Sequence, residues 1–275
     1  MHSRERWKVS LVNQQIETLI DGRPFSWAVK GEFSWGSGGP LCQVESDPLM
    51  PVLGSQGYRV IDLPPGTADR IKRSAQSLSQ LAGLTNFEKY HEWVASDAEH
   101  LKIIQASCDL RFSQLGLDPK EFTRYFAELV GLNLSPIIPI LNKDVVQLRI
   151  NRPGSTDYNP PHRDGSLPHL APTLNVWIPV VGVDETTSLP ILPGSHAIAE
   201  ADCWQTQPGG AVLGGNPYRV PAIGRLRNGP LKMVRAPVRF GQALIFTPYL
   251  IHGLAFNNSD TKTRMALEMR FQIVR

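Results

Sequence analysis

Short apolar stretches dominate the second half of the chain and predict β-strands. They cover residues 145–150, 173–181, 231–237, 243–246 and 265–274. Glycine, proline and asparagine separate these stretches, which is the punctuation expected of strands joined by turns. The pattern therefore predicts a mainly β fold, in which two sheets pack face to face as a jelly roll.

The first half of the chain is mainly helical in its pattern. One alternating stretch, residues 57–63, predicts a strand. Helical periodicity follows over residues 67–81, 86–107 and 119–130. Asp118 precedes the third helix as a candidate N-cap.

The change of pattern near residue 144 suggests how the chain is organised. Residues 1–55, where Trp27 and Trp35 are scattered among glycines, show no clear period. We expect one domain over residues 1–275. In it, a mostly helical part at 1–144 packs on a jelly-roll core at 145–275.

Composition narrows the class of protein without naming it. With 275 residues, 41% hydrophobic and 19% charged, the chain can bury a sizeable core and is neither disordered nor collagen-like. Its net charge is only +3, and no run is rich in lysine or arginine, so we expect no nucleic-acid partner. No stretch approaches 18 apolar residues, so we expect no membrane partner.

The cysteines bear on the compartment. Cys42, Cys108 and Cys203 are odd in number and widely spaced, which argues against a disulfide framework or a cysteine zinc site. Residues 1–6 lead into no apolar segment of the kind that signal peptides contain. A reducing, cytoplasmic location is therefore the default expectation.

Two histidines and one aspartate form a candidate metal site. His162 and Asp164 lie two residues apart, and an extended backbone directs such positions to the same side. His252 follows far along the chain in an apolar stretch that we expect to be a strand. Two imidazoles and one carboxylate are the facial ligand set of mononuclear iron oxygenases. The alternative is that the triplet arises by chance and that His252 is a hydrogen-bonded core residue.

An arginine near the C-terminus offers a second element of chemistry. Arg264 follows His252 closely enough to return on an antiparallel strand, where its planar guanidinium would suit a dicarboxylate. Arg270 would share the same strand face and is the rival. The alternative for Arg264 is a surface ion pair with Asp260 or Glu268.

Residues 145–275 resemble the phytanoyl-CoA dioxygenase family of iron(II)/2-oxoglutarate oxygenases. The resemblance lies in His162-x-Asp164 with His252, in Leu-Pro-Gly-Ser-His at 192–196, and in Asn-Ser-Asp at 258–260 before Arg264. Gln-Leu-Arg-Ile-Asn at 147–151 is similar to a strand of the ectoine hydroxylase branch. The first 140 residues carry no motif of the family.

The resemblance implies a double-stranded β-helix with N-terminal helices packed outside, and it implies roles for named residues. His162, Asp164 and His252 would bind iron(II), and 2-oxoglutarate would chelate the iron while its far carboxylate meets Arg264. O2 would be the third cofactor.

Two further polar residues belong to the same implied site. Asn151 would hydrogen-bond the cosubstrate, and Gln147 would serve cosubstrate or substrate. For both residues, an ordinary polar strand end is an open alternative.

The chain also departs from the family pattern. Residues 186–188 read Thr-Thr-Ser where many members carry Asn-Gly, and Leu254 stands where some members carry serine or threonine. Neither departure removes a metal ligand or Arg264. They leave the subfamily, and hence the substrate, open.

Residues 200–230 suggest a cover for the site. This stretch is rich in glycine and proline and lacks a period, which predicts a mobile loop. Its Arg219, Arg225 and Arg227, beside Tyr218, would recognise an anionic substrate. The alternative is a solvated surface loop.

Three residues outside this stretch are further candidates for substrate contact. They are Arg149, His169 and Trp177. For Trp177 the alternative is ordinary core packing.

Together these observations predict a dioxygenase that hydroxylates a small molecule and releases succinate and CO2. Two alternatives stay open: a non-catalytic jelly-roll binding protein, and a cupin-type metal-dependent isomerase or hydrolase. Amino acids, sugars or sugar nucleotides, secondary metabolites and fatty acyl conjugates all remain possible substrates. The oligomeric state is open.

Overall fold

The structure is a computed structural model that describes residues 13–78, 81–94, 96–213 and 216–274. Its strands are β1 (Asn13–Ile20), β2 (Arg23–Trp35), β3 (Tyr58–Asp62), β4 (Leu134–Ser135), β5 (Ile137–Ile138), β6 (Lys143–Asn151), β7 (Thr173–Val181), β8 (Pro190–Ile191), β9 (Cys203–Leu213), β10 (Asn216–Tyr218), β11 (Ile223–Leu226), β12 (Gly229–Pro230), β13 (Lys232–Arg235), β14 (Gln242–Phe246) and β15 (Arg264–Ile273). Its α-helices are α1 (Met50–Leu53), α2 (Thr67–Gln76), α3 (Tyr90–Trp93), α4 (Asp97–Ser107) and α5 (Pro119–Val130).

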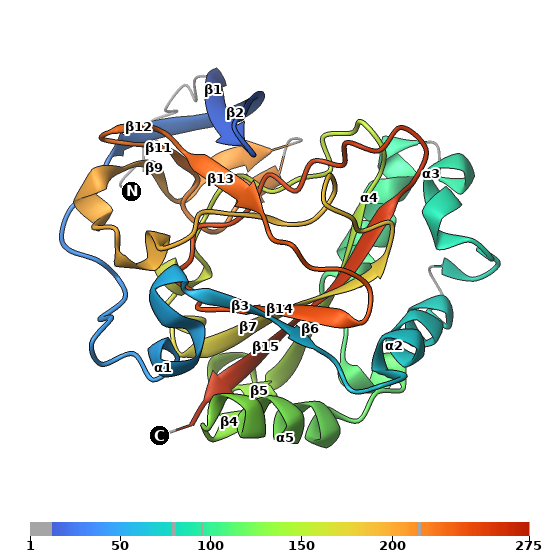
Figure 1. The fold of residues 1–275 in the computed structure, drawn as a ribbon. Helices are drawn as coiled ribbons and strands as arrows, with labels where there is room; N and C mark the ends of the chain where they lie inside the picture. Colours follow the sequence, from blue (N-terminus) through green and yellow to red (C-terminus); the bar gives the residue numbers. More distant parts are fainter. Residues whose placement is uncertain (1–12, 79–80, 95, 214–215, 275) are drawn as a thin grey trace, which may run out of the picture.

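Two sheets form the jelly roll (Figure 1). The first sheet has the order β12-β11-β9-β2-β1-β13-β8, with β10 paired to β9. The second has the order β3-β14-β7-β15-β6-β5, with β4 paired to β15. The prediction of a mainly β jelly roll with flanking helices is confirmed.

The helices cover the outer face of the second sheet (Figure 1). Helix α2 packs against β7, α4 against β6, and α5 lies beside β4. One large apolar cluster joins these helices to the odd-numbered residues of β15, from Met265 to Phe271. The even-numbered residues of β15 therefore face the interior between the sheets, where the polar chemistry lies.

Helix α5 has the predicted bounds, because local signals fix both of its ends. The side chain of Asp118 accepts a hydrogen bond from the backbone N–H of Lys120 at 2.9 Å. Gly131, at φ 68°, ends the helix in the left-handed conformation. Phe122 and Phe126 recur on one face and are buried.

The other predicted helices are shorter than their patterns suggest. Helix α2 ends at Gln76, and residues 79–80 of the predicted helix lie outside the described residues. The predicted helix at 86–107 is divided into α3 and α4. The Ser96 side chain caps α4 by accepting from the N–H of Glu99 at 3.2 Å, which starts a new helix there.

The N-terminal residues contribute strands as well as helices. Strands β1 and β2 form a hairpin in the first sheet, and β3 pairs with β14 in the second. Asp21 and Gly22 join β1 to β2 with positive φ angles of 51° and 75°. The described part of residues 1–144 is therefore woven into both sheets.

The prediction that residues 200–230 form a loop is wrong. Their described part supplies strands β9 to β12 of the first sheet. The glycines in this stretch favour a loop, but in the structure the described ones lie in strands, of which β9 is irregular. The register of β2 against β9 shifts between Gly31 and Phe33, and Gly209 takes a φ of 74° near this shift.

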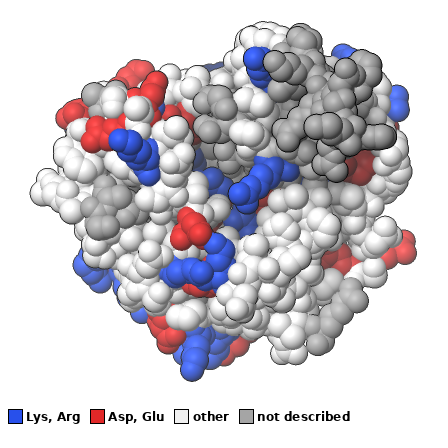
Figure 2. Space-filling model, turned by 180° about the vertical axis from the view of Figure 1, so that it is seen from behind, with Lys and Arg blue, Asp and Glu red and all other residues white. Residues whose placement is uncertain are grey.

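Two further features describe the molecule as a whole. The three cysteines are free, and none of the described helices has the length and apolar character needed to cross a bilayer. Figure 2 shows acidic and basic side chains interspersed over one face.

Candidate metal centre

Three buried side chains converge between the sheets. His162, Asp164 and His252 each offer one ligand atom, and these atoms lie within 4.8 Å of one another. The Nε2 atom of His162 is 3.5 Å from Oδ1 of Asp164, and that of His252 is 4.0 Å from Oδ2. Two imidazoles and a carboxylate on one side of a common point fit an octahedral metal with open positions opposite.

Backbone hydrogen bonds hold the two histidines together. Contrary to the expectation, neither of them lies in one of the strands. They face each other in an isolated antiparallel bridge, with N–H···O distances of 2.9 and 3.1 Å. Prolines 160, 161 and 248 precede them and lack the N–H groups that a regular ladder needs. Arg163 is nevertheless extended (φ −119°, ψ 122°), so His162 and Asp164 still point to one side.

Backbone carbonyls orient both imidazoles. Nδ1 of His162 lies 2.8 Å from the carbonyl oxygen of Pro160, and Nδ1 of His252 lies 3.0 Å from that of Leu250. With Nδ1–H donating to these carbonyls, each Nε2 is left for a metal. Burial, followed by the neighbouring His162, lowers the pKa of His252 to about 4. The neutral form, which binds metals, is therefore favoured.

The carboxylate of Asp164 is held in place and kept charged. Its Oδ2 accepts hydrogen bonds from Asn175 Nδ2 at 2.8 Å and from the Arg270 guanidinium at 2.8 and 3.1 Å. Burial alone would raise the pKa of Asp164, but Arg270 and the two imidazoles hold it well below the usual value. An ionised Asp164 is the form that binds a metal.

The turn at residues 192–196 braces the segments that carry the ligands. The Ser195 hydroxyl accepts from the N–H of Ile251, next to His252, at 2.7 Å. Arg163, next to His162, donates to the carbonyl oxygens of Ser195 at 2.8 Å and Ile198 at 3.1 Å. This motif is thus a structural clamp behind the metal centre.

Gly253 allows the two ligand segments to approach closely. It has a φ of 143°, and a Cβ there would lie 2.5 Å from the carbonyl oxygen of Pro160. That oxygen is the acceptor that orients His162. Only glycine fits this position without moving the ligand.

Arg264 is buried with part of its guanidinium unpaired. One NH2 group donates to Oδ1 of Asn151, while Nε and NH1 have no hydrogen-bond partner among the described residues. The guanidinium lies 5.5 Å from the Trp177 ring. Burial lowers the pKa of Arg264 to about 9, because its charge is desolvated. A buried cation with free donors fits an anionic ligand.

Arg270 is less suited to bind an anionic ligand, because its guanidinium already has partners. Its guanidinium is engaged with Asp164, and its NH2 group lies 3.7 Å from Oε2 of Glu268. Of the two rival arginines, Arg264 is therefore the one suited to a cosubstrate.

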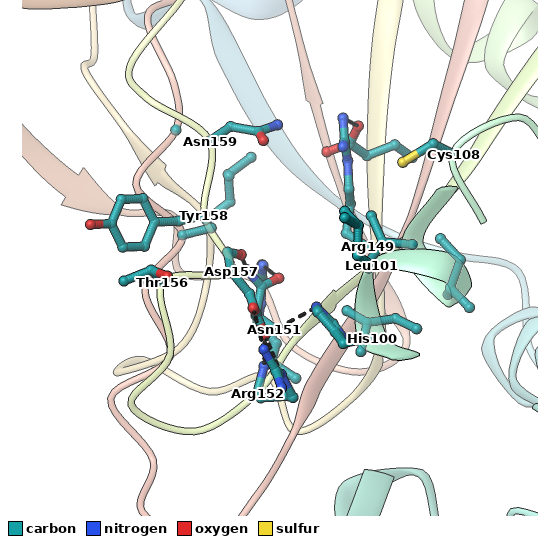
Figure 3. A pocket seen from close by; sticks show the side chains of 18 of the residues that line it. His100, Leu101, Cys108, Arg149, Asn151, Arg152, Thr156, Asp157, Tyr158 and Asn159 are labelled. Carbon is teal, nitrogen blue, oxygen red and sulfur yellow. Dashed lines mark hydrogen bonds and ion pairs between the residues drawn. The ribbon is translucent and has the colours of Figure 1, made fainter. Parts of the chain in front are cut away.

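A cavity of about 510 Å³ lies beside the two histidines. Figure 3 shows part of its lining. Its walls come from β6, β7 and β15, from helix α4, and from the segment at residues 152–159. His162, His252, Asn151 and Arg264 all line it. The cavity therefore brings the two candidate histidine ligands and the partly unpaired guanidinium of Arg264 to one space.

Some of the other residues predicted to bind substrate or cosubstrate line the cavity, and others do not. Arg149 and Trp177 line the cavity. Gln147 is outside the described lining and accepts hydrogen bonds from Arg149 at 2.8 Å and Arg270 at 3.4 Å, so it positions these arginines. Tyr218 packs edge-on against the His162 ring, with centroids 5.3 Å apart.

Besides Gln147 and Tyr218, three more predicted residues lie outside the cavity lining. His169 is partly exposed in the turn after Asp164. Arg225 is exposed and stacks on the rings of Trp35 and Trp204, and Arg227 lies 4.7 Å from the Trp35 ring. Stacked on the first sheet, these arginines do not cover the metal centre.

A cluster that the sequence did not reveal closes one side of the cavity (Figure 3). Arg152 pairs with Asp157 at 2.9 Å and with Asp97 of α4 at 2.7 Å. His100 of α4 lies 3.2 Å from Asp157, whose backbone carbonyl accepts from Asn151. The cluster therefore ties the segment at 152–159 to α4 and, through Asn151, to Arg264. No local signal marks these residues, because they meet only in the fold.

Comparison with solved structures finds proteins of low sequence identity. AviO1 from Streptomyces viridochromogenes Tue57 is 17% identical over 84% of this chain and 96% of its own, with a TM-score of 0.48. SnoK, described as a non-heme alpha-ketoglutarate-dependent carbocyclase from nogalamycin biosynthesis, is 18% identical over 86% and 87%, with a TM-score of 0.46. EctD from S. alaskensis is 14% identical over 89% and 85%, with a TM-score of 0.44.

The sequence comparisons give a family. No curated protein matches the chain. The family model described as phytanoyl-CoA dioxygenase (PhyH) matches residues 55–266, which contain the metal triad, the turn at 192–196 and Arg264. The chain therefore belongs to the phytanoyl-CoA dioxygenase family.

Proposed function

We propose that this protein is an iron(II)- and 2-oxoglutarate-dependent dioxygenase that hydroxylates a small molecule and releases succinate and CO2. One observation carries the proposal: the two histidines of the buried triad line the same cavity as Arg264, whose Nε and NH1 atoms have no partner among the described residues. Iron(II), when bound, would supply the activation of O2.

The residues of the chain would hold the reactants and exclude water. His162, Asp164 and His252 would bind the metal, and Arg264 would bind the far carboxylate of 2-oxoglutarate through parallel N–H···O bonds. Asn151 would fix the guanidinium through its existing hydrogen bond. All three metal ligands are less than 5% exposed, so the reaction would proceed away from bulk water.

The two alternative functions leave parts of this arrangement without a role. A non-catalytic binding protein has no use for three oriented metal ligands. A cupin-type isomerase or hydrolase would use the metal but would leave the donors of Arg264 unused. We further propose that the substrate carries an anionic group, with Arg149 as its partner in the cavity. A cytoplasmic location stays a prediction.

The first test of this function is metal binding. Anaerobic titration should show that one ferrous ion binds to the wild-type protein and that His252→Ala loses this affinity. His91→Ala, which alters a histidine outside the cavity lining, is the matched control and should bind as wild type. Unchanged stoichiometry in His252→Ala would contradict the ligand assignment.

The second test is the reaction itself. Succinate release should depend on ferrous iron and 2-oxoglutarate, and the product should gain the mass of one oxygen atom. A product that gains chlorine would contradict hydroxylation, because halogenases that resemble this family carry a small residue in place of the carboxylate ligand, where this chain has Asp164. No iron-dependent succinate release across a broad metabolite panel would refute the function.

A further inference from the structure

Arg149, the residue proposed above to meet an anionic group of the substrate, is itself paired with a carboxylate in the cavity. Arg149 on β6 lies 2.9 Å from Glu268 on β15, between the NH2 group of the first and Oε2 of the second. Both residues line the cavity, and Figure 3 shows Arg149 there. Their side chains keep 24% and 14% of their surface accessible, so part of each side chain reaches the cavity.

Stability alone does not explain why this pair is there. Arg270 pairs with Asp164 at 2.8 Å and lies farther from Glu268, at 3.7 Å, and Arg264 is at the other end of β15 from Arg270. Replacing a buried ion pair by apolar residues is often neutral or stabilising. Helix α4 contributes the apolar side chains of Leu101 and Ile104 to the lining, besides the polar Asp97 and His100. A few polar groups in a largely apolar pocket usually fix the orientation of a ligand.

The net charge of the wall limits what the cavity accepts. The charged residues of its lining, histidines aside, balance one another. They are Arg149, Arg152 and Arg264 against Asp97, Asp157 and Glu268. A divalent metal and a dianionic cosubstrate would preserve this balance. A substrate with net charge would then be buried without compensation, which is costly at low dielectric.

The local charges of the pair narrow the class further. A lone carboxylate that approaches Arg149 would also meet the carboxylate of Glu268, and a lone ammonium would meet Arg149. A group that carries both charges satisfies both residues at once, and charge-assisted hydrogen bonds are about twice as strong as neutral ones. Leu101 and Ile104 offer an apolar surface beside such a group.

We propose that the substrate is a zwitterion, an α-amino acid with a largely apolar side chain. Its carboxylate binds Arg149 and its ammonium group binds Glu268. The inference rests on the proposed function and names the substrate class for that same cavity. The ammonium group of the zwitterion gives Glu268 a partner, which a substrate with an anionic group alone would not provide.

The test measures binding by calorimetry, without turnover. The protein is first loaded with Mn(II) and 2-oxoglutarate, and each binding step is recorded. Free apolar α-amino acids are then compared with their N-acetyl derivatives, which lack the ammonium, and their methyl esters, which lack the carboxylate. At least one free amino acid should bind, and each derivative should bind roughly tenfold or more weakly, as expected for the loss of one charged hydrogen bond.

Two variants assign the charges. Glu268→Gln should weaken binding of the free amino acid about tenfold and leave binding of its N-acetyl derivative unchanged. Arg149→Gln should also weaken binding of the free amino acid about tenfold, but it should leave binding of the methyl ester unchanged. Glu121→Gln, which breaks a partly exposed pair with Arg70 outside the cavity lining, is the matched control and should change nothing.

The outcomes separate this inference from the proposed function. If Mn(II) and 2-oxoglutarate bind but no free amino acid does, or if the derivatives bind as tightly as their parents, the zwitterion is refuted while the function stands. If Mn(II) and 2-oxoglutarate fail to bind, the function is refuted, and the inference falls with it. The comparison of ligands on the wild-type protein decides the matter even where a variant does not fold.

Discussion

Replacing Arg264 by lysine isolates the contribution of its planar guanidinium to cosubstrate binding. Arg264 is 2% exposed and donates to Asn151, while its Nε and NH1 atoms stay unpaired among the described residues. Lysine keeps the positive charge but presents one ammonium group in place of a fork with parallel donors. The change therefore tests geometry at constant charge.

The magnitude follows from the hydrogen bonds that would be lost. A hydrogen bond to a charged group contributes about 1.5–3 kcal/mol. Losing one of two parallel bonds to a carboxylate corresponds to a roughly 10- to 150-fold weaker Kd for 2-oxoglutarate. Metal affinity should stay within about twofold, because no ligand atom of the triad contacts Arg264, and twofold is about 0.4 kcal/mol.

Calorimetric titration of 2-oxoglutarate into the Mn(II)-loaded protein measures this change. Arg270→Lys is the matched comparison, since Arg270 lies on the same face of β15 but is bound to Asp164. It should keep cosubstrate affinity and weaken metal binding. If Arg264→Lys bound 2-oxoglutarate as wild type while Arg270→Lys lost it, the assignment of the two arginines would be reversed.

Three further outcomes are expected. Asn175→Ala removes a hydrogen bond to Asp164 and should weaken metal affinity roughly 10- to 100-fold in anaerobic titration, whereas wild-type affinity would show that Asn175 does not hold the ligand. Burial would raise the pKa of Asp157, but hydrogen bonds hold it well below the unfolded value of about 3.9, so this carboxylate stabilises the fold above about pH 4 and loses that effect as the pH falls. Urea unfolding of Asp157→Asn should therefore show a stability deficit at pH 7 that shrinks at pH 3, and an equal deficit at both would contradict this. Arg225→Ala should lower the free energy of unfolding by about 0.5–1 kcal/mol by removing its stacking on Trp35, and it should leave 2-oxoglutarate affinity unchanged. Weaker affinity would support the prediction that residues 200–230 cover the site.

Much of the core and the candidate metal ligands could be predicted from sequence, because local patterns encode the strands and the spacing of these residues. The stretches at 145–150 and 173–181 became β6 and β7, and helix α5 has the bounds that Asp118 and its apolar period predicted. The spacing of His162 and Asp164 placed them on one side of an extended segment, which the backbone of Arg163 supplies. These features depend on residues close in the chain.

Two strand regions were missed for a different reason. The β1–β2 hairpin carries a recognisable Asp21-Gly22 turn signal, but its aromatic residues and glycines obscured the alternation. Strands β9 to β12 contain glycine and proline because β9 is irregular against β2. In both places, pairing with a distant strand outweighs weak local propensity.

The tertiary structure alone decided which charged residues pair with one another. The sequence supplied two arginines on one face of a strand and left the choice between them open. The register of β15 sets Arg264 opposite Asn151 of β6 and Arg270 opposite Asn175 of β7. The guanidinium of Arg264 therefore keeps two nitrogen atoms without a partner among the described residues, while that of Arg270 reaches Asp164. Sheet register and the packing of α4 are set by contacts summed over the whole core. For this reason the sequence determined which chemical groups the site contains, and the fold determined which of them are paired and which are left for ligands.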